Sequence, residues 1–198
     1  MHNGENETNV EDNEDGYARL SLPKRVIIYT TNNLIQLLSE GKKSSGDGTF
    51  KTCPALWKQI FIIMVKLNNQ WIPVSYAMLP DKTQKSYFTM FYMLMAHIKD
   101  NAMDFNIESM RMDFEIASMK TAAGVWKVIV KGCYFHFTQA GWRFVQNNNM
   151  AKAFLKESDE EFNDFVKAVL ALPHVPLADL QETINIIVIQ SKSDNISF

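Results

Sequence analysis

The chain has 198 residues, of which 46% are hydrophobic and 21% are charged, as expected of an ordinary globular protein with one well-filled core. No window approaches 18 or so consecutive apolar residues and the N-terminus is polar, so we expect neither a membrane span nor a signal peptide. The two cysteines, Cys53 and Cys133, are far apart in the sequence. They are expected to be free thiols of an intracellular protein.

The charge is unevenly distributed, although the formal net charge is only -2. Residues 1–16 contain six acidic residues, no Lys or Arg, and no apolar periodicity, which predicts a disordered acidic tail. The remainder carries a small positive excess. Such an excess permits contact with a polyanion but does not indicate one, because nucleic-acid-binding domains are usually far more basic.

The N-terminal half alternates between strand-like and helical patterns. We expect a strand at 25–31, a helix at 32–43 that ends near Gly41, a strand edge at 47–53, and a hairpin at 57–79. The hairpin turns at Asn68 and Asn69, residues that tolerate positive φ. Its first arm, IFIIMV, is continuously apolar and predicts a strand that is buried on both faces.

The second half adds a helix at 83–101 that is apolar almost all round, and its methionines and aromatics are interpreted first as core. Further along we expect a strand at 109–114, a helix at 115–124 closing at Gly124, a strand at 126–136, and helices from 137 onward. This order predicts an α/β fold with a mixed sheet flanked by helices and a helical C-terminal extension. The predicted units are the tail at 1–16, a core at 17–136 and a helical segment at 137–198.

Asp47 and Asp113 each lie beside a predicted strand, and neighbouring strands would bring the two carboxylates together. Mg²⁺ binds one or two carboxylates together with phosphate oxygens, and it assists phosphoryl displacement. The structural alternatives are that Asp47 belongs to a turn before Gly48 and that Asp113 is a helix N-cap. Glu115 is interpreted as a solvated first-turn acid.

Cys133 and His136 form a C-x-x-H pair, which offers two ligands where structural zinc requires four. No second pair at ligand spacing accompanies them, so zinc is disfavoured. We expect Cys133 at a strand end and His136 in the first turn of a helix, as core or hydrogen-bonding groups close to a site.

Taken in order, DGTF, P-x-x-Y-A-x-L-P-D-K-T, D-F-E and C-x-F-H resemble the transposase domain of Mutator-like elements (MULE). The resemblance covers about residues 25–190. It implies an RNase H-like fold, with Asp47 and Asp113 as catalytic metal ligands for Mg²⁺ or Mn²⁺, and Cys133 and His136 close to the active site. It also implies DNA as partner, a nuclear location, and no small-molecule cofactor or membrane partner.

The sequence departs from the family at its C-terminal end, because no segment before Phe198 matches the third acidic residue. The acidic residues at 157–164 are interpreted as a solvated helix start. We therefore expect a truncated insertion segment and weak or no DNA cleavage. The alternatives are a non-catalytic domesticated or relic domain that binds DNA or protein, with a homo-oligomer as one form, and an unrelated α/β metal-dependent hydrolase.

Overall fold

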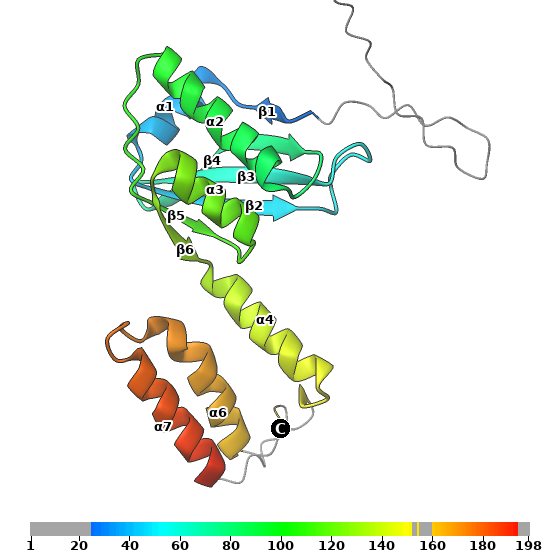
Figure 1. The fold of residues 1–198 in the computed structure, drawn as a ribbon, viewed down its shortest axis with the longest axis vertical. Coiled ribbons are helices and arrows are strands. Elements are labelled where there is room, and N and C mark those ends of the chain that lie inside the picture. The colour runs from blue at the N-terminus through cyan, green and yellow to red at the C-terminus, as the bar shows by residue number, and fades with distance from the viewer. Residues whose placement is uncertain (1–24, 152–153, 155–159, 194–198) are drawn as a thin grey trace, which may run out of the picture.

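The computed structural model describes residues 25–151, 154 and 160–193 (Figure 1). The predicted acidic tail at 1–16 lies outside the described residues. Six strands span, in chain order, Ile27–Tyr29 (β1), Lys43–Thr49 (β2), Gln59–Leu67 (β3), Gln70–Leu79 (β4), Ser109–Met112 (β5) and Ile129–Gly132 (β6). They form one sheet in the order β1-β4-β3-β2-β5-β6.

The sheet is mixed. The pairs β1–β4, β4–β3 and β3–β2 are antiparallel, whereas β5 runs parallel to both β2 and β6. The β3–β4 hairpin turns at Asn68 and Asn69, whose φ values are 45° and 64°, as their residue types predict. The predicted α/β class, a mixed sheet flanked by helices, is therefore confirmed.

One face of the sheet is covered by three helices, namely α1 (Asn32–Glu40), α2 (Gln84–Asp100) and α3 (Ile116–Trp126). Their apolar side chains pack with those on the inward face of β3 in a single core that contains Phe61, Ile63 and Val65. Thr31 caps α1 through its hydroxyl, which accepts from the Leu34 amide at 3.3 Å. Gly41 ends this helix, as predicted.

The opposite face of the sheet is more open than the sequence predicts. Along β3, inward residues are buried and the residues between them, Ile60, Ile62 and Met64, are only half-buried. The expectation that IFIIMV is buried on both faces is therefore wrong for the described part of the chain. An alternating burial pattern arises because α1, α2 and α3 all contribute to the core on one side.

The helical C-terminal stretch begins at α4 (Tyr134–Asn147), continues in α6 (Glu160–Ala171), passes through the 3-10 helix η1 (Leu172–His174), and ends in α7 (Leu180–Ser193). Phe162 and Val166 of α6 pack with Val145 of α4 in a second, smaller core. Figure 1 shows α4 leading away from β6 toward the α6–α7 pair. Among the described helices, none combines the length and the apolar character needed to cross a membrane.

Three predicted boundaries move in the structure. The strand predicted at 47–53 runs instead from Lys43 to Thr49, because its pairing with β3 and β5 extends it through the polar residues before Asp47. The helix predicted to close at Gly124 continues to Trp126, and Lys127 adopts the left-handed conformation at its end. Strand β6 is short, and α4 already begins at Tyr134.

Candidate active site at the ends of β2 and β5

Asp47 lies inside a strand. It belongs to β2 and is in register with Ile62 of β3, so the alternative of a turn residue is wrong. Along β2, Ser44 and Gly46 are buried on the helix-covered face. Because successive residues of a strand face opposite sides of the sheet, the Asp47 side chain lies on the open face. The Asp47 side chain is 60% exposed.

Asp113 directly follows the last residue of β5. Because Gly46 of β2 is in register with Met112 of β5 in a parallel pair, Asp47 and Asp113 occupy the next position on neighbouring strands. Met110 and Met112 are buried on the helix side, so Asp113 continues the alternation onto the open face. The strands thus bring the two predicted carboxylates to one place.

The N-cap position of α3 is occupied by Glu115, not by Asp113. The alternative role of Asp113 as a helix cap is therefore wrong. Its Oδ1 atom is buried and has no hydrogen-bond partner. A buried carboxylate oxygen without a partner is costly, and a bound cation is one way to satisfy it.

Burial raises the pKa of Asp113, and the negative charges of Glu115 and Asp47 raise it further. A hydrogen bond from the Glu115 backbone and the nearby His136 act in the opposite direction. Desolvation and the like charges therefore disfavour the ionised form of Asp113 when no cation is bound. A divalent cation between the two acids would remove the repulsion.

His136 lies in the first turn of α4, as predicted, and Cys133 is the N-cap residue of that helix, directly after β6. The Cys133 amide donates to the Met112 carbonyl at 2.7 Å, which fixes the beginning of α4 at the end of β5. His136 Nε2 lies 3.9 Å from Asp47 Oδ1, and its Nδ1 is buried without a partner. A protonated His136 would therefore attract Asp47 electrostatically.

Behind the acids lies a polar network that the sequence reasoning missed. Gln59 donates from Nε2 to the Tyr87 hydroxyl at 2.6 Å, and Tyr87 donates to Glu115 Oε1 at 2.6 Å. Lys82 Nζ pairs with Glu115 Oε2 at 2.8 Å. Glu115 is thus not the solvated acid expected, since its side chain is only 19% exposed.

The hydrophobic core holds the central residue of this network, Tyr87, which is fully buried. The Tyr87 ring packs edge-on against Phe61 at 5.6 Å between centroids. Burial and the hydrogen bond to Glu115 raise the pKa of the Tyr87 phenol, so it remains a donor at neutral pH. The signal that could have revealed the network is Gln59, a polar residue at an inward position of an apolar strand.

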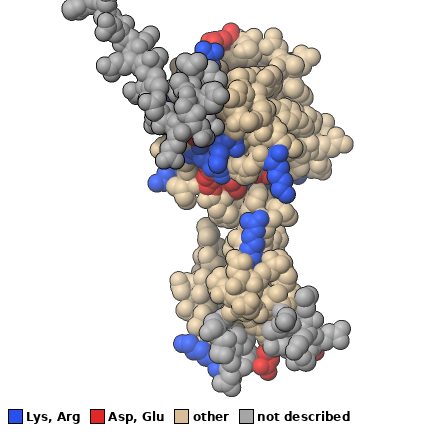
Figure 2. Space-filling view, turned by 90° about the vertical axis from the view of Figure 1, so that its right-hand side faces the viewer, with Lys and Arg blue, Asp and Glu red and all other residues tan. Residues whose placement is uncertain are grey.

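The candidate site is partly exposed, since the Asp47 side chain reaches solvent whereas Asp113 Oδ1 and His136 Nδ1 are buried. Viewed from the end of the sheet toward which the β2 arrow points, acidic side chains gather beside basic ones above the helical part (Figure 2).

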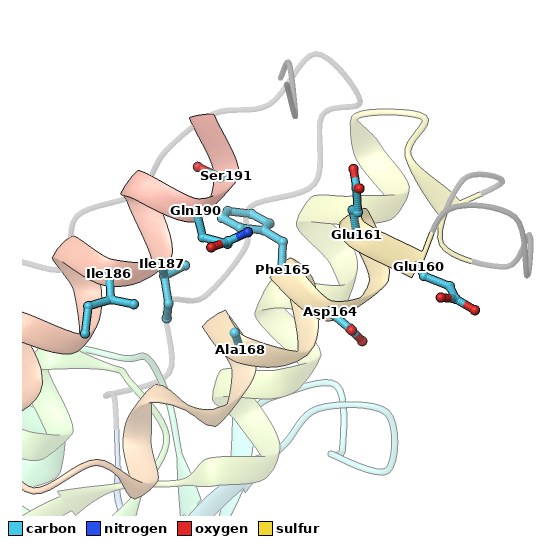
Figure 3. Close-up of a pocket in the computed structure, with 9 residues that line it drawn as sticks. All are labelled: Glu160, Glu161, Asp164, Phe165, Ala168, Ile186, Ile187, Gln190 and Ser191. Carbon is cyan, nitrogen blue, oxygen red and sulfur yellow. The ribbon is translucent and has the colours of Figure 1, made fainter. Parts of the chain in front are cut away.

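A separate hollow of about 480 Å³ lies between α6 and α7 (Figure 3). It draws none of its lining from the sheet and has an acidic rim of Glu160, Glu161 and Asp164. Its lining contains no residue of the Asp47–Asp113 site.

Within the described part of the chain, no group of three or more His, Cys, Asp or Glu side chains is arranged to hold a metal ion. Among the residues that the structure describes, the acid pair therefore offers two carboxylate ligands, and no four-ligand zinc site surrounds Cys133 and His136. Comparison with known proteins finds no matching family model, no matching curated protein and no matching solved structure.

Proposed function

We propose that this chain is a MULE-type transposase-derived domain with an RNase H-like fold, which uses Asp47 and Asp113 in metal-dependent cleavage and transfer of DNA strands. The observation that carries the proposal is the register of β2 and β5, which puts the two acids side by side. The ordered motifs of the sequence support the same assignment. A nuclear location forms part of this proposal.

The residues present fit a divalent cation such as Mg²⁺ or Mn²⁺. Asp113 has an unpartnered buried oxygen, and Asp47 lies next to it with an exposed carboxylate. Two carboxylates suffice for Mg²⁺ when waters and substrate phosphate oxygens complete its coordination. When bound, such an ion supplies charge stabilisation for the attacking and leaving oxygens of a phosphodiester.

The protein side chains would position the substrate and the acids. Tyr87 and Lys82 hold the Glu115 side chain in place. The negative charge of Glu115 disfavours ionised Asp113, so a cation bound to Asp113 would relieve this repulsion. His136, at the edge of the site, can donate to a phosphate oxygen or to Asp47. The described residues supply no third acidic ligand, so we expect this chain alone to cleave DNA slowly.

Nicking of supercoiled plasmid DNA tests the proposal. We expect slow nicking that requires Mn²⁺ or Mg²⁺ and disappears in Asp47→Asn and in Asp113→Asn. Asp104→Asn, which changes an exposed carboxylate outside the site, is the matched control and should retain full activity. Nicking that persists in Asp47→Asn, or that needs no divalent cation, would refute the assignment.

A second candidate function is non-catalytic binding through α2, either to a second copy of the chain or to another protein. Phe88 and Tyr92 stack with 5.7 Å between centroids and are 50% and 57% exposed, and Met93 is exposed beside them. Exposed apolar patches mark interaction surfaces. If the mass in solution is that of a dimer without DNA, and Phe88→Lys with Tyr92→Lys makes it monomeric, this candidate is favoured.

A further inference from the structure

The open face of the sheet carries a group of basic side chains that the proposed cleavage does not use. Lys43, Lys66, Arg111 and Lys131, together with Trp71, line a hollow of about 160 Å³. Strands β2, β3, β5, β6 and β4 each contribute one of these residues. The register of five neighbouring strands therefore brings these residues together.

Like charges face each other in this group. Lys43 is in register with Lys66 across β2 and β3, and Arg111 is in register with Lys131 across β5 and β6. Like charges directly opposite on neighbouring strands are destabilising. In the part of the chain that the structure describes, none of these four cations forms an ion pair or hydrogen bond. An anion bound in the hollow would offset their mutual repulsion.

Trp71 gives the hollow an aromatic wall. It is in register with Lys66 on β4, and its side chain is half-buried. Aromatic side chains beside a basic groove are the usual platform for bases of single-stranded nucleic acid, because every base has a face that can stack. A compact anion such as free phosphate would make no use of this ring.

The hollow and the acid pair share one face and the same two strands. Lys43 precedes Asp47 by four residues on β2, and Arg111 precedes Asp113 by two on β5. At about 3.3 Å per residue, the cations lie roughly 7 to 13 Å from the acids along the strand direction. One strand of stacked B-form DNA carries a phosphate per about 3.4 Å of helix axis, so this separation spans at most about two to four nucleotides, and fewer in an extended single strand.

We infer that the hollow around Lys43, Lys66, Arg111, Lys131 and Trp71 binds the phosphate backbone and an unpaired base of a DNA single strand, a few nucleotides from the scissile phosphate. The choice of DNA rests on the proposed function, whereas the polyanion site itself rests on the cations and the ring. The strand would run along β2 and β5 across the open face. This site would hold a separated strand end in register with the acids.

Fluorescence anisotropy of a labelled oligo(dT) strand, titrated with protein in EDTA over a series of NaCl concentrations, tests the inference. Without divalent cations, binding is measured independently of cleavage. We expect Lys66→Gln with Arg111→Gln to weaken binding roughly tenfold and to reduce the salt slope by about 1.4, since each phosphate contact to a single strand contributes about 0.7. Lys99→Gln with Lys120→Gln removes the same charge from exposed positions on α2 and α3 and should leave the slope unchanged.

Trp71→Leu separates stacking from charge. We expect it to weaken oligo(dT) binding about fivefold or more with the salt slope preserved, because stacking of a base on an aromatic ring is uncharged. Circular dichroism of each variant verifies folding. Equal losses in the Lys99/Lys120 control and in the Lys66/Arg111 variant would overturn the site, as would wild-type binding by Trp71→Leu or tight binding to duplex DNA only. If oligo(dT) binds as expected while plasmid nicking is absent, the proposed cleavage fails and this inference stands.

Discussion

Asp47 of β2 and Asp113, the residue that directly follows β5, occupy equivalent positions beside each other, each one residue beyond the paired Gly46 and Met112. This arrangement depends on the mixed sheet. The chain passes from β4 through α2 to β5, and β5 therefore lies beside β2 and runs parallel to it. The repulsion between the acids is partly balanced by His136 and by the backbone of Glu115.

The raised pKa of Asp113 makes stability depend on pH. Because its pKa in the folded protein lies above the ordinary value of 3.8, the native state binds more protons than the unfolded state between these two values. The free energy of unfolding therefore falls as pH rises through this interval. Asp113→Asn should remove this loss, so its Tm in EDTA should exceed that of the wild type at neutral pH and approach it in acid. A Tm difference that is independent of pH would contradict this origin; Asp104→Asn is the control.

Tyr87→Phe removes the hydroxyl that joins Gln59 to Glu115. Both partners would then be left buried or half-buried without their hydrogen bond, which costs about 1–3 kcal/mol. Urea unfolding should show this loss in Tyr87→Phe. Tyr92→Phe changes an exposed tyrosine on the same helix and should alter stability by less than about 0.5 kcal/mol. If both variants unfold at the same urea concentration, the network contributes nothing to stability.

Gly46→Ala should distort the sheet beneath the acids. A Cβ atom at this position would lie 2.8 Å from the Phe61 ring and would also meet Met110, both of which are fully buried. Overpacking of this kind costs about 1–3 kcal/mol. Gly124→Ala is the matched control: nothing lies within 4 Å of its added Cβ, and it should stabilise α3 by about 0.5–1 kcal/mol. We expect the urea midpoint to fall in Gly46→Ala and to rise in Gly124→Ala. An unchanged midpoint in Gly46→Ala would contradict the close packing around Gly46.

The sequence patterns predict the elements that depend on local signals. The hairpin at Asn68 and Asn69, the end of α1 at Gly41 and the placement of His136 in the first turn of α4 all follow from residue type and spacing. The convergence of Asp47 and Asp113 requires β2 and β5 to be neighbours, which the order of the elements permits but does not require. Features that depend on contacts between distant segments could not be predicted from local patterns. The start of β2 at Lys43 depends on pairing with β3 and β5, which overrides the weak strand propensity of its Ser and Gly residues.

The role of Glu115 could not be predicted for the same reason. Its partners Lys82 and Tyr87 are 33 and 28 residues away in the chain. A local pattern at a helix start indicates only a favourable acid near the positive end of the dipole. The basic hollow is equally hidden, because its residues come from five strands and become neighbours only through the register of the sheet.

Electron paramagnetic resonance of added Mn²⁺ measures directly whether Asp47 and Asp113 share one cation. We expect one bound ion per wild-type chain, strong weakening in Asp47→Asn and in Asp113→Asn, and a loss in the double variant that is smaller than the sum of the two single losses, because both acids hold the same ion. Asp104→Asn should bind as the wild type does. Unchanged affinity in either single variant would mean that these carboxylates do not share a cation.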